Sequence, residues 1–98
     1  MAAERSMKYD PEKLYDVLEG RRCKVSASLE AGYVGDLEGF AVYRGSHKNG
    51  TDLIAVKGNT VLSAVRYLPI SEDWYVAGGE PAINDMLTEA VESKRIRL

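Results

Sequence analysis

Apolar residues recur at helical spacing over residues 10–20, which predicts a short amphipathic helix. Asp10 can cap the first free N–H groups, and Pro11 suits the first helical position because it has no N–H to satisfy. Gly20 can end the helix. The apolar face consists of Leu14, Val17 and Leu18.

Alternating apolar and polar residues, typical of a strand, follow over residues 21–29. Residues 30–33 predict a turn. The segment 34–44 has the composition of a strand but is long for one, and Gly35 and Gly39 within it indicate a bend or a bulge. We therefore expect a strand, a turn and a second, bent strand in this part of the chain.

Two tight turns separate the next strands. The Asn-Gly pair at 49–50 favours a hairpin with a type I′ turn, and the apolar strand 52–57 follows it. Residues 58–59 signal a second turn. Residues 60–68 are the most β-rich segment of the chain, and Pro69 ends it. These signals predict antiparallel strands joined by hairpins.

The last part of the chain combines an irregular segment with a helix. Residues 70–80 lack a period and predict a loop, in which Trp74 and Tyr75 cover the core or an interface, or stack on a base. A second amphipathic helix is expected over residues 81–95. It either packs on the rest of the chain or presents its apolar face to a partner. That face consists of Ile83, Met86, Leu87, Ala90 and Val91.

This order of elements predicts a mainly β fold: a small, strongly bent antiparallel barrel with an N-terminal helix and an added C-terminal helix. We expect a flexible N-terminus over residues 1–7, the barrel with its first helix over 8–70, and the loop and last helix over 71–98. With 98 residues, 45% hydrophobic and 29% charged, the composition fits one globular domain.

Composition also narrows the function. The chain has no apolar run of about 18 residues and only one cysteine, Cys23, so we expect a cytoplasmic protein without membrane spans or an internal disulfide. Residues 21–69 carry seven basic and four acidic side chains between acidic flanks, which permits a phosphate-binding surface. His47 is the only histidine. We expect no catalysis, no metal and no cofactor.

Three segments resemble the Sm and LSm proteins. YDPEKLYDVLEGRRCKVSASL, at residues 9–29, is similar to the N-terminal helix and first strand of that family. Gly39, His47 and Asn49 match the spacing of its first motif, and VKGNTVLSAVRYLP, at residues 56–69, is similar to the second. The resemblance implies an SH3-like, Sm-like barrel. Only eight residues separate Asn49 from the glycine of the second motif, so the middle strands are shortened.

The resemblance implies one nucleotide pocket, in which the two motifs meet. From the first motif, Asn49 would hydrogen-bond a base edge, and His47 or Lys48 would pack on a base face. The chain differs from the family's usual first motif at two positions. Gly45 replaces the usual aspartate, and Lys48 replaces an apolar residue.

From the second motif, Lys57 would cover the other base face or neutralise a phosphate. Gly58 would allow close approach of the backbone, and Asn59 would brace the loop. A plain hairpin tip at HKNG and a plain turn at KGN explain the same residues.

The resemblance further implies a homo-oligomeric ring, a hexamer or heptamer, closed by pairing of strand edges. Such a ring would bind short U-rich single-stranded RNA without catalysis. The alternative is an SH3-like oligomeric scaffold that does not bind RNA and holds a protein partner through the C-terminal helix, at Met86 and Leu87.

Overall fold

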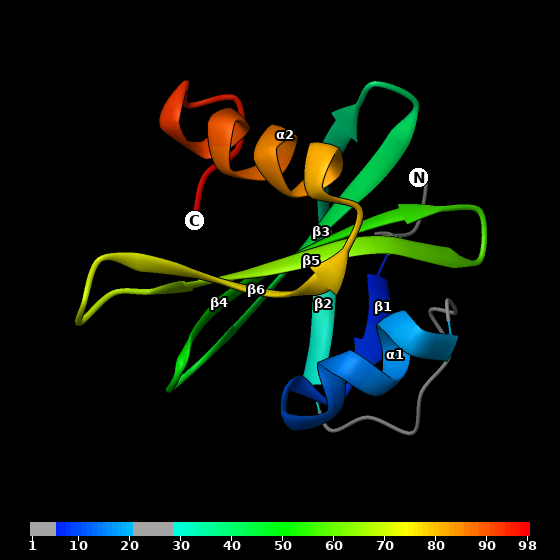
Figure 1. The fold of residues 1–98 in the computed structure, drawn as a ribbon, viewed down its shortest axis with the longest axis horizontal. Coiled ribbons are helices and arrows are strands. Elements are labelled where there is room, and N and C mark those ends of the chain that lie inside the picture. Colours follow the sequence, from blue (N-terminus) through cyan, green and yellow to red (C-terminus); the bar gives the residue numbers. More distant parts are fainter. Residues whose placement is uncertain (1–5, 21–28) are drawn as a thin grey trace, which may run out of the picture.

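A computed structural model describes residues 6–20 and 29–98 of the chain. The fold is mainly β, as predicted: six antiparallel strands form one open sheet, in which each strand pairs with the next along the chain, and two α-helices pack on it (Figure 1). The elements are β1 (Ser6–Tyr9), the 3-10 helix η1 (Pro11–Lys13), α1 (Leu14–Gly20), β2 (Leu29–Leu37), β3 (Phe40–His47), β4 (Gly50–Lys57), β5 (Thr60–Leu68), β6 (Asp73–Gly79) and α2 (Pro81–Glu92).

The first helix begins where the sequence predicts. The Asp10 carboxylate accepts a hydrogen bond of 2.9 Å from the backbone N–H of Glu12, and Pro11 occupies the first helical position. This cap satisfies one of the free N–H groups at the helix start. One turn of 3-10 helix then continues into α1, whose apolar face is buried. That face consists of Leu14, Val17 and Leu18.

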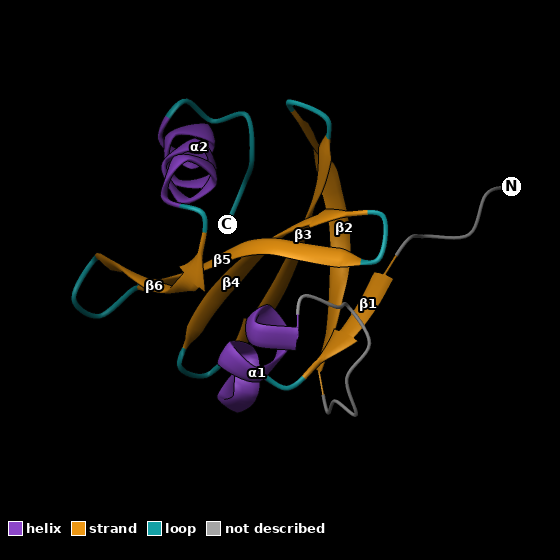
Figure 2. Cartoon of the chain, turned by 45° about the vertical axis from the view of Figure 1, so that its right-hand side comes forward, coloured by secondary structure: helices purple, strands orange, loops and turns teal. Residues whose placement is uncertain are grey.

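The two α-helices cover opposite faces of the sheet (Figure 2). Along β4, Ile54 and Val56 belong to the core beneath α1, whereas Leu53 and Ala55 belong to the core beneath α2. A strand that is covered on both faces has no polar side, because successive side chains point to opposite faces and both are dry. This explains why the sequence LIAV runs without a polar interruption.

The structure corrects the predicted layout of residues 30–44. Residues 30–33 belong to β2 instead of a turn, because Gly32 pairs with Ser6 on one side and with Arg44 on the other. The register shifts between Tyr33 and Gly35, so an irregularity lies next to one of the two glycines at which a bend or a bulge was predicted. The long segment is two strands, with its turn at Glu38 and Gly39. The strand expected over residues 21–29 lies outside the described residues except for its last position.

Residues 73–79 correct a second prediction, since they form strand β6 where a loop was expected. β6 pairs only with β5, and a register shift between Ala64 and Val65 interrupts that pairing. Of its seven residues, only Ala77 is buried. An edge strand with one buried side chain and a bulge shows neither alternation nor an apolar run, so its sequence carries little strand signal.

The last helix packs on the chain's own sheet, which is one of the two alternatives that the sequence left open. Leu87 and Ala90 are buried in the core beneath α2, and the other apolar positions of the predicted face pack against it. The helix ends at Glu92, before the predicted end at 95, because Lys94 takes a positive φ of 64°. No helix in the described ranges is long and apolar enough to cross a membrane.

Candidate functional site

The two segments expected to form one pocket lie at opposite ends of β4. His47 pairs with Gly50 across the β3–β4 turn, and Lys57 pairs with Thr60 across the β4–β5 turn. Consecutive hairpins of a meander turn at alternate ends of the strand they share. An eight-residue strand is about 26 Å long, far more than the width of a nucleotide pocket. The expected meeting of the two motifs is therefore not formed within one chain.

Both hairpin tips are accessible. Lys48 and Asn49 are exposed at the first tip, whereas His47 beside them is partly buried. The residues of the second tip, Lys57, Gly58 and Asn59, are all exposed. Five of the six predicted site residues thus face solvent, in two separate groups.

The first turn differs from the predicted type. Lys48 and Asn49 are its two central residues, and Gly50 already belongs to β4. A type I′ turn needs positive φ at both central positions, and neither residue has it. Gly50 itself has a φ of 149°, and a Cβ there would collide with the backbone oxygen of Tyr67. The Asn-Gly pair predicts the hairpin, but glycine is required by this close approach.

A buried polar network lies behind the first tip, centred on the fully buried carboxylate of Asp52. The hydroxyl of Tyr9 donates to Asp52 Oδ2 over 2.6 Å. Arg66 donates from Nε to Asp52 Oδ1 over 2.6 Å, and its Nη2 also reaches the backbone oxygen of Pro11 at 2.7 Å. A buried carboxylate is stable only with such partners, because removal of a charge from water is costly.

His47 belongs to this network, and both of its ring nitrogens are engaged. Nε2 lies 3.0 Å from Asp52 Oδ2, and Nδ1 accepts a 3.2 Å hydrogen bond from the backbone N–H of Asn49. An acceptor at Nδ1 and a carboxylate at Nε2 fit the neutral ring with its proton on Nε2. Neither nitrogen is left to act as a general base on a substrate. The arrangement braces the hairpin tip.

The network shifts the proton affinity of two of its members. Burial raises the pKa of Tyr9, and its hydrogen bond to the negative Asp52 raises it further. The hydrogen bond to Asp52 also raises the pKa of Arg66. Tyr9 therefore stays neutral and Arg66 stays charged well beyond the pH at which each would ordinarily titrate. Both residues keep the protons that they donate to Asp52.

Gly45 fits the same network by its lack of a side chain. A Cβ at this position would collide with the hydroxyl and ring of Tyr9. Position 45 therefore requires glycine, because the Tyr9 ring occupies the space of a side chain. Sequence reasoning missed the network. Its one signal is Asp52, an acidic residue next to the apolar run of β4.

A second surface lies along the edge strand β6 and the adjoining side of α1, and of its residues only Tyr75 was expected from the sequence to cover the core or an interface. Tyr15, Tyr75 and Val76 are large apolar side chains with exposed fractions of 53%, 43% and 46%. The hydroxyls of Tyr15 and Tyr75 are 2.6 Å apart, and the rings meet edge to face. We call these three residues the β6 surface. Trp74, by contrast, packs against the core beneath α2.

The β6 surface adjoins two recesses. One has a volume of about 120 Å³ between η1, α1 and the strands β5 and β6, and the other has about 380 Å³ at the end of α1. Tyr15 and Ala77 line both recesses, so the two recesses adjoin at these residues, and we call them together the groove between α1 and β6. Over residues 6–20 and 29–98, no group of three or more side chains is arranged to hold a metal ion.

No protein family model, no curated protein and no solved structure matches this chain.

Proposed function

We propose that this chain is a non-catalytic protein–protein interaction module that assembles with further copies of itself through the β6 surface. The observation that carries the proposal is the edge strand β6. Its outer side pairs with no other described strand, and it presents Tyr75 and Val76 to solvent. An edge with free backbone N–H and C=O groups and exposed apolar side chains is a template for association.

Two further observations support this function. Tyr75 lies on the face of the sheet that carries α1, next to Tyr15, whereas Val76 pairs with Val65, which belongs to the core beneath α2. A second protein along this edge would cover apolar area on both faces at once. Catalysis has little support, because both nitrogens of the only histidine are engaged within the fold.

The test is the mass of the protein in solution, measured by light scattering over a range of concentrations. The wild type is expected to assemble at tens of micromolar, and Val76→Lys is expected to reduce it to the 10.8 kDa monomer because it places a charge on the apolar edge. Ile70→Lys is the matched control, since Ile70 is fully exposed in the turn before β6. A wild type that stays monomeric at several hundred micromolar would refute the proposal.

RNA binding is the second candidate, and the exposure of both hairpin tips favours it. Lys48, Asn49 and Lys57 offer two cations and an amide to solvent, which suits phosphates and base edges. Because the tips are at opposite ends of β4, a pocket of both motifs would need two copies of the chain. The Sm-like barrel and a ring of six or seven copies belong to this candidate.

A direct binding measurement separates the two candidates. A labelled U-rich oligonucleotide, titrated at low and moderate salt with an oligo-A control, is expected to bind in a salt-dependent way if the second candidate holds. Asn49→Ala and Lys57→Ala would then each weaken binding. An absence of binding at tens of micromolar folded protein would discard the RNA function and leave the interaction module.

A further inference from the structure

The groove between α1 and β6 is apolar at its base and acidic at its margins. Leu14 and Ala77 line the smaller recess, and Leu18 lines the larger one. Glu12 stands at the first recess and Glu19 at the second, on either side of Tyr15, and both are exposed.

The charge of this groove is not neutralised by its own lining. Arg66 is the one described basic residue in the lining of either recess, and it already pairs with the buried Asp52. Asp16, on the same helix between Glu12 and Glu19, is also exposed. The groove thus favours an occupant that brings an apolar side chain together with positive charge.

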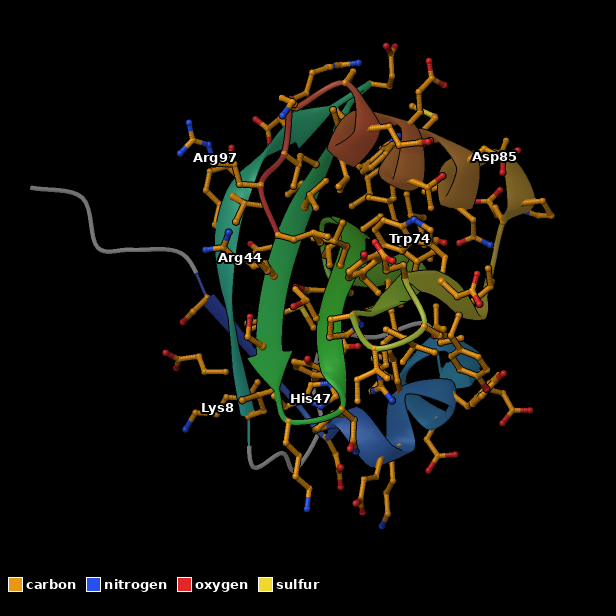
Figure 3. The ribbon with its side chains drawn as sticks, turned by 90° about the vertical axis from the view of Figure 1, so that its left-hand side faces the viewer. Lys8, Arg44, His47, Trp74, Asp85 and Arg97 are labelled. Carbon is orange, nitrogen blue, oxygen red and sulfur yellow. The ribbon has the colours of Figure 1, made fainter. Side chains whose placement is uncertain are left out.

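The chain itself carries such an occupant in its last residues. Leu98 is apolar with 42% of its surface exposed, and Arg95 and Arg97 beside it are exposed as well. Figure 3 shows Arg97 and Arg44 on the same side of the molecule, and Arg44 Nη1 donates to the backbone oxygen of Arg97 over 2.7 Å.

The segment around these residues is anchored. The backbone N–H groups of Arg95 and Ile96 donate to the oxygen of Ala90 over 2.8 and 3.1 Å, and the Ile96 side chain is buried. Leu98 and the two arginines are therefore presented from a fixed position, which lowers the entropy cost of an intermolecular contact.

We infer that the groove between α1 and β6 binds the Arg95–Leu98 segment of a second copy of the chain. Leu98 enters the smaller recess, and Arg95 and Arg97 pair with Glu12 and Glu19. A recess of about 120 Å³ is of the right order for one aliphatic side chain, since a cavity of about 150 Å³ accepts a benzene ring. The inference rests on the proposed self-assembly and names the two surfaces that meet.

This contact joins two different surfaces, so it is heterologous. The groove is built by α1 and β6, whereas the basic segment follows α2 on the opposite face of the sheet (Figures 1 and 2). Each copy keeps a free groove at one end and a free segment at the other. Such head-to-tail contacts close into rings or continue as filaments.

Charge reversal of each surface tests the inference. The groove variant is Glu12→Lys with Glu19→Lys, and the segment variant is Arg95→Glu with Arg97→Glu. All four residues are exposed, so both variants should retain the circular dichroism spectrum of the wild type. Each variant alone is expected to be monomeric in light scattering, with self-affinity weaker by roughly tenfold or more.

An equimolar mixture of the two variants is the decisive sample. It is expected to assemble to the size of the wild type, because every contact again joins opposite charges. Asp85→Lys with Glu89→Lys is the matched control, since it makes the same charge change on the exposed side of α2, where Figure 3 shows Asp85 far from Arg97, and it should assemble normally.

The outcomes separate this inference from the proposed function. A monomeric wild type would overturn both. A wild type that assembles while both reversal variants also assemble would overturn the inference and keep the self-assembly. Loss of assembly in each variant without recovery in the mixture would equally overturn it, because the two surfaces would then not contact each other.

Discussion

Tyr9 and Tyr15 lie on either side of the start of α1, and their hydroxyl groups act in contrasting surroundings. Tyr9 is fully buried and donates to the carboxylate of Asp52, whereas Tyr15 is exposed and shares a hydrogen bond with Tyr75. The first contact joins β1 to the centre of the sheet. The second joins α1 to the edge strand of the sheet, between two side chains that are 53% and 43% exposed. The same chemical group therefore contributes to the fold in one place and leaves an interaction surface in the other.

Of the variants that distinguish the two tyrosine sites, Asp52→Asn is expected to have the largest effect on stability. The variant removes the charge that Tyr9, Arg66 and His47 surround, and we expect a loss of about 3 kcal/mol in the free energy of unfolding, because a buried pair loses one partner. Denaturant titration measures this loss. Asp73→Asn on the exposed start of β6 is the control, and it should leave stability nearly unchanged. Equal effects of the two variants would contradict the role of the network.

Gly45→Ala should give the next largest effect. The added methyl group collides with the ring of Tyr9, and we expect a loss of about 2 kcal/mol, typical of an overpacked core. Thermal or chemical unfolding measures it. Gly32→Ala is the matched control in the neighbouring strand, because a Cβ there meets no atom within 4 Å. If Gly45→Ala were as stable as this control, Tyr9 would not occupy the position described.

The raised pKa of Tyr9 predicts that the free energy of unfolding depends on pH in the alkaline range. The pKa is raised in the folded state, so above about pH 10 the unfolded chain loses a proton that folded Tyr9 keeps. The stability that Tyr9 contributes is therefore fully present below about pH 10. Above that pH it falls by about 1.4 kcal/mol per pH unit. Chemical denaturation at about pH 9, 10 and 11, around the ordinary tyrosine pKa, measures the slope of the unfolding free energy against pH.

The control for this slope is Tyr9→Phe. This variant is less stable at neutral pH but should lose less stability between pH 10 and 11, because it has no hydroxyl to ionise at this position. An identical slope in the two proteins would assign the alkaline loss to other groups.

Tyr15→Phe should have the smallest effect. The hydrogen bond to Tyr75 raises the pKa of Tyr15, yet the pair is exposed, and water replaces the lost partner. We expect no measurable change in the free energy of unfolding, measured by denaturant titration. A large loss of stability would show that this contact supports the fold in the same way as the buried network.

Local signals in the sequence predicted most of the fold. The cap at Asp10, the turn at 58–59 and the stripe of α2 each depend on residues a few positions apart, and each is observed. The hairpin predicted from the Asn-Gly pair is also observed, but its turn is centred on Lys48 and Asn49 and is not of the predicted type. Strand β6 was not predicted, because an edge strand with a single buried residue has no periodic pattern. Elements that depend on residues close together in the sequence can therefore be predicted without knowledge of tertiary contacts.

The candidate sites were harder to predict from the sequence. Tyr9 and Asp52 are 43 residues apart, and Tyr15 and Tyr75 are 60 apart, so no short motif contains either pair. Residues 47–50 and 57–59 were each expected at a turn, and each lies at one. Their separation follows from a feature that neither motif contains, namely that a single strand, β4, connects them.

The order of the strands in the sheet equals their order in the chain, and this has a consequence for folding speed. Hairpins β2–β3, β3–β4 and β4–β5 each close a loop of two residues, so little loop entropy opposes their formation. Strand β1 is the exception, because the chain from Asp10 to Ser28 must be spanned before it reaches β2. We expect β2 to β5 to form the folding nucleus, and the Tyr9 hydroxyl to reach Asp52 only after the main kinetic barrier has been crossed.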